Sequence, residues 1–441
     1  MERQTQFQAL VAVLRAALHP GEQFSLAYEA EVSDFIRFNH GQVRQAGCVQ
    51  QASVSLKLIH AGRHADLTLT LADDADEDRR RLEQAVTQVR QALPLLPPDP
   101  YLLPNTEAWH SENRQAAPLP DTQDVVARIS ERAHGLDLVG IYAAGLIYRG
   151  FASSWGAMGW HQANSFNLDW SLFHTNGQAV KANYAGHDWD SAAFDRQFEQ
   201  AREQLDYLGR PAITLAPGQY RAYLAPAALD EIIGMLAWGG FSAQAIASKH
   251  SPLQRLYDGE ARFNAAVSLD EQVSGSLSPA FSGEGYPRRD LALIKHGKAG
   301  ERLVDSSSAA EYNLPANGAN AGESPSALSM AGGDLEQAQI LARLGTGLYI
   351  GNLWYLNFSD MPAARMTGMT RFATFWVEDG RIIAPVSTMR FDDSAYSLLG
   401  DQLEALTRER ELILSTSTYE QRQTSSTHLP GALINRLTLT L

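Results

Sequence analysis

The residues of this chain that could take part in metal chemistry begin with two adjacent carboxylates, Asp230 and Glu231. They stand in a predicted helix, Ala225–Trp238, whose apolar residues recur at spacings of three and four. A helix is a suitable platform for ligands because it fixes them on one side, and Asp230 could bind a metal ion through its carboxylate oxygens. The ordinary alternative is a core helix with an acidic first turn, which the helix dipole favours.

Length and composition are typical of an ordinary globular protein with two or three domains. The chain has 441 residues, of which 44% are apolar and 20% are charged. The single cysteine, Cys48, excludes an internal disulfide and a thiolate metal cluster. The formal net charge of −14 would repel nucleic acid and anionic lipid, so we expect neither as a partner.

No targeting segment or common catalytic motif is recognisable. Residues 1–6 lack a basic start followed by an apolar core, which argues against a signal peptide. No run approaches the roughly 18 apolar residues that a membrane span needs, so we expect no membrane contact. Together with the single cysteine, these features favour a cytoplasmic protein. The nucleophile elbow, the phosphate loop and the dinucleotide glycine pattern are all missing from the sequence.

Two regions of different pattern must position the acidic helix. Residues 1–210 alternate strand meanders with helices, and a proline-dense connector covers about 94–120. The density of Pro and Gly near Gly209–Pro217 marks a domain boundary. Residues 211–441 begin with a strand and the helix that carries Asp230. The succession of meanders and helices predicts an α+β fold.

The end of the second region has three predicted elements. The pattern of Tyr396–Leu406 predicts a helix, and Ala432–Leu441 alternates cleanly enough to predict a closing strand. The Ser- and Thr-rich segment Ser425–Pro430 is typical of a surface turn.

The frame Asp230-Glu231-Ile232-Ile233-Gly234-Met235, preceded by a strand and a turn, resembles the central segment of the TldD/PmbA family of zinc-peptidase-like proteins. Four later blocks match that family in order: Ser278–Asp290, Leu293–Lys298, Gly347–Ile350 and Phe375–Val386. Ser282–Gly285 departs from an acidic run typical of the family, which indicates a divergent branch. The resemblance covers most of 211–441 and implies a two-domain α+β fold with antiparallel sheets and packed helices.

The resemblance also implies a metal motif that this chain has lost. Catalytic members carry His-Glu-x-x-x-His on this helix, whereas Asp230 and Met235 stand here at the two His positions and Glu231 keeps the Glu position. The family's third ligand is a cysteine near the C-terminus, where this chain offers only His428 as a candidate. Because a thioether is a poor zinc ligand and a catalytic zinc needs three protein ligands, we expect zinc to be absent.

Two further expectations concern the vestigial site. Without a metal-bound water Glu231 has nothing to deprotonate, so it is expected to remain only as an acid at the helix start. Ligands five residues apart lie about 140° around a regular helix, and Gly234 would ease the distortion needed to align them. The hypothesis is that the helix keeps this distortion and that Met235 fills the space left by the metal.

The resemblance leaves three functional alternatives open. The first is a PmbA/TldE-like subunit without metal that supports proteolysis of unfolded or ribosomally made peptides, as a homodimer or as a heterodimer with a TldD-type subunit. The second is an active metallopeptidase with a site rebuilt from Asp230, Glu231 and His428. The third is a peptide-binding scaffold without catalysis. The family label, modulator of DNA gyrase, implies no contact with DNA.

Overall fold

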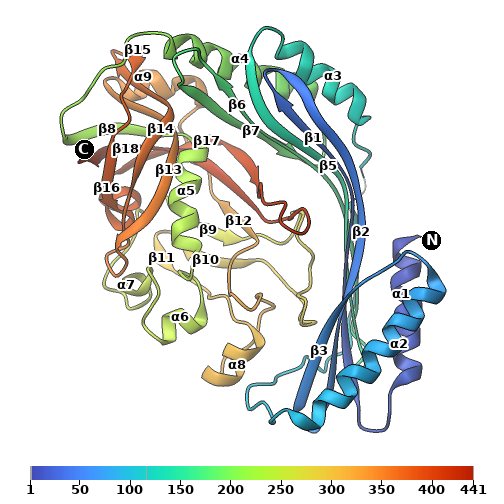
Figure 1. Cartoon of the computed structure of the whole chain (residues 1–441). Helices are drawn as coiled ribbons and strands as arrows, with labels where there is room; N and C mark the ends of the chain where they lie inside the picture. The colour runs from blue at the N-terminus through green and yellow to red at the C-terminus, as the bar shows by residue number, and fades with distance from the viewer. Residues whose placement is uncertain (1, 116, 441) are drawn as a thin grey trace.

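The computed structural model describes residues 2–115 and 117–440, in which each half of the chain forms its own β-sheet (Figure 1). Within these ranges the first sheet has seven strands, in the order β3-β2-β1-β5-β6-β4 with β7 also paired to β6. The second has eleven strands, in the order β11-β10-β9-β12-β18-β16-β14-β13-β8, with β15 added on β14 and β17 on β18. The predicted α+β class, with antiparallel sheets and packed helices, is confirmed.

The first sheet and its helices come from the chain before residue 209. The elements are α1 (Arg3–Ala17), β1 (Gln23–Asn39), β2 (Gln42–His60), β3 (Arg63–Thr70), α2 (Ala75–Ala92), the 3₁₀ turn η1 (Leu93–Leu95), β4 (His110–Gln115), α3 (Thr122–Arg132), β5 (Asp137–Ser153), β6 (Met158–Phe173), β7 (Ala179–Gly186) and α4 (Ser191–Leu208).

The second sheet and its helices come from the chain after residue 217. They are β8 (Gly218–Leu224), α5 (Pro226–Ala237), α6 (Ala243–Ala247), α7 (Gln254–Tyr257), β9 (Leu269–Glu271), β10 (Leu291–Lys295), β11 (Lys298–Ala299), α8 (Ser306–Tyr312), β12 (Ala327–Met330), η2 (Gln337–Gln339), α9 (Ile340–Leu344), β13 (Gly347–Asp360), β14 (Arg365–Glu378), β15 (Arg381–Pro385), β16 (Arg390–Ser394), the π turn η3 (Ser397–Asp401), β17 (Leu403–Leu414) and β18 (Ser426–Leu439). The predicted division at 210/211 falls in the segment between α4 and β8.

The long strands of the first sheet bend along one side of the second domain (Figure 1). Helices α1 and α2 cover one end of this sheet, and α3 and α4 pack at the other. The apolar face of α1 consists of the buried residues Phe7, Leu10, Val11 and Leu14. Burying one such side chain contributes about 1.5–3 kcal/mol, so one stripe is enough to hold the helix on the sheet.

The second domain is organised around the pairing of β8 with two strands. β8 is parallel to β13 and antiparallel to β18, and β14 and β16 complete a closed circuit of hydrogen-bonded strands. Helix α5 follows β8 directly and packs on β13 and β18. Its buried face consists of Leu229, Ile232, Ile233 and Leu236, as the apolar spacing predicts.

The two domains share apolar and polar contacts. Ala373 and Phe375 of β14 lie in the same apolar cluster as α3, α4 and the first sheet. Arg422, between β17 and β18, is buried against the first sheet, where its guanidinium donates to the carbonyl oxygens of Gly145 (3.3 Å) and Ser165 (2.9 Å). Burial lowers the pKa of Arg422 to about 10, and Glu31 opposes this change. These contacts fix the wall that the first domain presents to α5.

The C-terminal elements differ from the sequence prediction. Of the predicted helix Tyr396–Leu406, residues 396–401 are helical, and its last four residues, Leu403–Leu406, instead begin strand β17 (Leu403–Leu414). The closing strand, β18, begins at Ser426 rather than at Ala432, because residues 426–430 pair with residues 410–414 of β17. Pairing with a neighbouring strand outweighs local propensity here. None of the helices in the two described ranges is long and apolar enough to cross a membrane.

Candidate functional site

A cavity of about 480 Å³ lies between helix α5 and the first domain. Strand β7 and helix α4 line it from the first domain. Helix α5 and strands β13, β17 and β18 line it from the second. Because both sheets contribute walls, the cavity exists only when the two domains are packed together.

Helix α5 presents its polar face to this cavity. The face that lines the cavity carries residues at spacings of three and four: Ala227, Asp230, Glu231, Gly234 and Ala237. Because the helix begins at Pro226, Asp230 and Glu231 are its fifth and sixth residues and belong to its second turn. The expectation that Glu231 serves the helix start is therefore wrong, since the dipole effect fades beyond the first turn.

Asp230 is held by the neighbouring strand. The hydroxyl of Thr427 on β18 donates a hydrogen bond of 2.6 Å to its Oδ1 atom. Burial raises the pKa of Asp230 above its ordinary value, and the Thr427 bond opposes part of this change. Burial also raises the pKa of Glu231. The nearby Asp230 carboxylate raises this pKa further, and the Lys181 ammonium group lowers it.

Two more carboxyl groups complete the polar lining. Asp169 on β6 lies 3.8 Å from Nζ of Lys181 on β7, and burial raises its pKa while Lys181 lowers it. Glu411 on β17 also lines the cavity, and burial raises its pKa. The lining therefore contains four carboxyl groups and one ammonium group. Such a surface favours cationic groups over anionic ones.

The other two residues singled out from the sequence do not line the cavity. Met235 is half-buried and packs against the apolar core of the second domain. His428 lies on β18 between β12 and β17, not in a surface turn as predicted. Because Thr427 faces Asp230, the next residue along the strand points to the other side of the sheet. The pKa of His428 is lowered by burial and by Arg410.

The hypothesis of a distorted helix is wrong. Helix α5 is uninterrupted from Pro226 to Ala237, and its last turn closes with a 3.1 Å bond from Trp238 N–H to Gly234 O. Since Met235 is not part of the cavity wall, it does not fill a space left by a metal. In the described ranges, no three His, Cys, Asp or Glu side chains lie close enough together to hold a metal ion.

The sequence reasoning missed Thr427, Glu411, Asp169 and Lys181. Glu411 follows Arg408-Glu409-Arg410, a charged run that is typical of a solvated face. Thr427 stands next to the candidate ligand His428, but only the register of β18 shows which of these two side chains faces α5.

Comparison with known proteins then decides the family. Residues 217–441 match the domain described as the PmbA/TldA metallopeptidase C-terminal domain. The chain belongs to the PmbA/TldD family. The family predicted from the helix frame and the four later blocks is thus confirmed. No curated protein sequence matches the chain.

Solved structures of PmbA/TldD type share the fold over the whole chain. TldE from Thermococcus kodakarensis has a TM-score of 0.79 at 13% identity and covers 99% of this chain and 100% of its own. A proposed modulator of a DNA gyrase from Thermotoga maritima has a TM-score of 0.75 at 14% identity and covers 99% of this chain and 100% of its own. A proposed modulator of DNA gyrase from Bacteroides thetaiotaomicron has a TM-score of 0.74 at 15% identity and covers 100% of this chain and 99% of its own. At these identities the likeness concerns the fold alone.

Proposed function

We propose that this chain is a PmbA/TldE-like subunit that binds no zinc, holds a peptide segment in the α5 cavity and supports proteolysis by a partner. The observation that carries the proposal is the donor set around α5. Asp230 is hydrogen-bonded to Thr427, while Met235 and His428 lie outside the cavity wall. A zinc site with an open position for water needs three ligands aimed at one point, and these side chains do not converge.

The cavity walls support a peptide as the occupant. Residues 180–183 of β7 all line the cavity, and within the described ranges β7 pairs only with β6. Glu411 and Ile413 of β17 line the opposite wall, and in the part of the chain that the structure describes residues 411–413 pair only with β18. Strand edges with free backbone groups can bind an extended chain through backbone hydrogen bonds, largely independently of its sequence. That mode suits unfolded or ribosomally made peptides.

The proposed function also requires a partner subunit and a cellular location. A partner subunit of TldD type, or a second copy of this chain, would supply the catalytic metal or complete the cavity. The acidic net charge of −14 disfavours nucleic acid as a ligand, and we place the protein in the cytoplasm.

The geometry weakens the rebuilt metallopeptidase but does not separate the scaffold from the subunit. A metallopeptidase rebuilt from Asp230, Glu231 and His428 would need His428 on the cavity side of β18. A scaffold without any enzymatic partner would have the same cavity. Co-purification from the native cell separates it from the subunit, because only the subunit should retain a peptidase.

A cavity-blocking variant tests the peptide site. A Cβ placed on Gly234 would meet no atom within 4 Å, so Gly234→Phe should fold and fill part of the cavity. We expect fluorescence anisotropy of a labelled unfolded peptide to show at least tenfold weaker binding to this variant than to the wild-type chain. Ala265→Phe, at an exposed position outside the cavity, is the matched control. Equal binding by both variants would contradict the site.

A further inference from the structure

A second cavity, of about 170 Å³, lies between the middle of the first sheet and loops of the second domain. Its walls come from β1 and β5 on one side and from segments 279–283 and 318–320 on the other. It shares no lining residue with the α5 cavity. Two arginines, Arg149 and Arg288, line it from opposite domains.

Arg149 on β5 is a largely buried cation with incomplete partners. Its side chain is 12% exposed, and its one hydrogen bond among the described residues runs from Nη1 to the carbonyl oxygen of Tyr148 (2.9 Å). The Glu29 Oε1 atom is 3.7 Å from its Nε, which is too far for a hydrogen bond. Because a guanidinium has five N–H groups, most of those on Arg149 are left for another acceptor.

The neighbours of Arg149 do not supply that acceptor. Glu29 is directly opposite on β1, but its side chain is 46% exposed and its other oxygen accepts a bond from Gln421. His161 is directly opposite on β6 and bonds through Nε2 to the Leu277 carbonyl (3.0 Å). Burial lowers the pKa of His161 to about 4, so it is neutral near pH 7.

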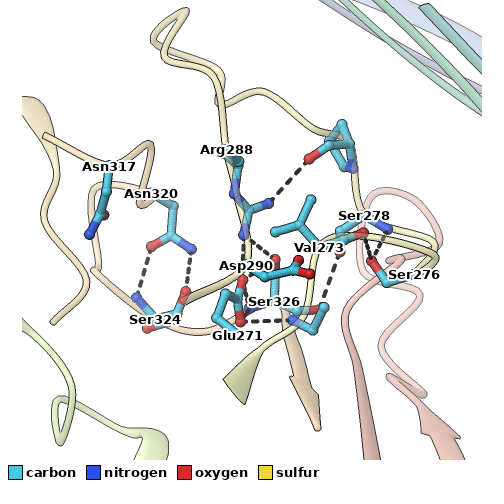
Figure 2. Close-up of polar contacts among 12 residues, drawn as sticks. Glu271, Val273, Ser276, Ser278, Arg288, Asp290, Asn317, Asn320, Ser324 and Ser326 are labelled. Carbon is cyan, nitrogen blue, oxygen red and sulfur yellow. Dashed lines mark hydrogen bonds and ion pairs between the residues drawn. The ribbon is translucent and has the colours of Figure 1, made fainter. Parts of the chain in front are cut away.

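Arg288 is fixed in place by a buried network (Figure 2). Its Nη2 donates to the carboxylate of Glu271 and to the Ser326 hydroxyl (2.6 Å). Glu271 is 1% exposed and also accepts from the backbone N–H groups of Ser326 and Ala327 (3.1 Å). This network balances the charge of Arg288, whose Nη1 also donates to the Pro279 carbonyl oxygen (3.5 Å), and among the described residues it leaves one Nη1 hydrogen and the Nε–H for another acceptor. Arg149 is paired only loosely, with the half-exposed Glu29 carboxylate 3.7 Å from its Nε. Glu29 also lines the cavity.

We propose that this cavity binds a small oxyanion, a carboxylate or phosphate group, between the guanidinium groups of Arg149 and Arg288. A guanidinium presents paired N–H donors that match two oxygens of such a group. The volume equals about five or six water molecules at roughly 30 Å³ each, which suits inorganic phosphate or a short carboxylate rather than a peptide chain. Because each domain contributes one arginine, the bound anion would also tie the domains together.

Calorimetric titration of the full chain tests the site, with phosphate, succinate and chloride compared at equal ionic strength. We expect saturable binding of phosphate, of succinate or of both, and none of chloride. Binding of phosphate alone identifies the site as one for phosphate groups, and binding of succinate alone as one for carboxylates. Absence of saturable binding by either would overturn the proposal.

Three variants connect the binding to this cavity. Arg149→Gln should weaken binding of the titrated anion at least tenfold. The control Arg202→Gln, which changes an exposed arginine on α4, should bind the anion like the wild-type chain. Gly283→Leu keeps both arginines but places a side chain in the cavity, where a Cβ meets no atom within 4 Å, and should also abolish binding. If Arg149→Gln fails to fold, Gly283→Leu decides alone. Unchanged binding by Gly283→Leu would show that the anion binds elsewhere and would overturn the proposal.

Discussion

The Thr427 hydroxyl donates a 2.6 Å hydrogen bond to Oδ1 of Asp230 and so joins β18 to α5 at the wall of the cavity. This bond occupies one oxygen of the carboxylate that the family resemblance aligns with a metal-ligand position. It also favours the ionised form of Asp230 and opposes the rise in pKa that burial causes.

Removal of this bond should destabilise the protein in a pH-dependent way. Thr427→Val should lower the free energy of unfolding by about 1.5–3 kcal/mol at pH 8, as for a hydrogen bond to a charged group. The loss should be smaller at pH 4, where Asp230 takes up its proton and the ionised acceptor disappears. Urea unfolding at both pH values measures this difference. Thr416→Val, also at the cavity wall, is the control, and an equal loss at both pH values would refute the role assigned to the ionised Asp230.

Glu411→Gln should stabilise the protein at neutral pH. Burial raises the pKa of Glu411 in the fold, and no hydrogen bond to its carboxylate is present among the described residues. The folded state therefore holds this proton more tightly than the unfolded state, and stability falls as pH rises from the unfolded pKa through the folded one.

The expected gain for Glu411→Gln is about 1 kcal/mol at pH 8, the lower end of the roughly 1–3 kcal/mol that an unpaired buried polar group costs, because the Glu411 side chain is only half-buried. Little gain is expected at pH 4, where the carboxyl group is mostly protonated in both states. Thermal unfolding at the two pH values gives the comparison. A destabilised variant at pH 8 would mean that Glu411 has a partner in solution.

Gly234→Ala should stabilise α5. The helix is regular at this position and the added Cβ meets no atom within 4 Å, so the usual advantage of alanine, about 0.5–1 kcal/mol, should be realised. Ile233→Ala, one residue earlier on the buried face, should instead cost about 2–5 kcal/mol. Denaturant unfolding of the two variants gives both values. A loss of stability with Gly234→Ala would restore the strained helix that the sequence had indicated.

The sequence predicts local features of this fold better than features that depend on strand pairing. Helix α5 was predictable because its four apolar residues repeat at helical spacing, which is a local property. Strand β17 was not, because its first four residues, Leu403–Leu406, fall in the predicted helix Tyr396–Leu406 and only the pairing with β18 makes them part of a strand. The family frame predicted Asp230 and Glu231 as site residues, and both line the cavity.

The rest of the site could not be predicted, because it depends on contacts between distant segments. Thr427 meets Asp230 across 197 positions of sequence, and the two sides of the cavity belong to different domains. Met235 shares the motif of Asp230 but not its face, since five residues turn a regular helix by about 140° beyond a full turn. A motif on a helix therefore indicates which residues to examine, and the helix geometry decides which of them face the site.

The zinc content of the purified chain tests the central claim most directly. After incubation with excess zinc and removal of free metal by gel filtration, elemental analysis should give well below one zinc per chain, because Asp230 is hydrogen-bonded to Thr427 and no second and third ligands converge on it within residues 2–115 and 117–440. About one zinc per chain, lost on substitution Asp230→Asn, would contradict the account and identify a rebuilt metal site.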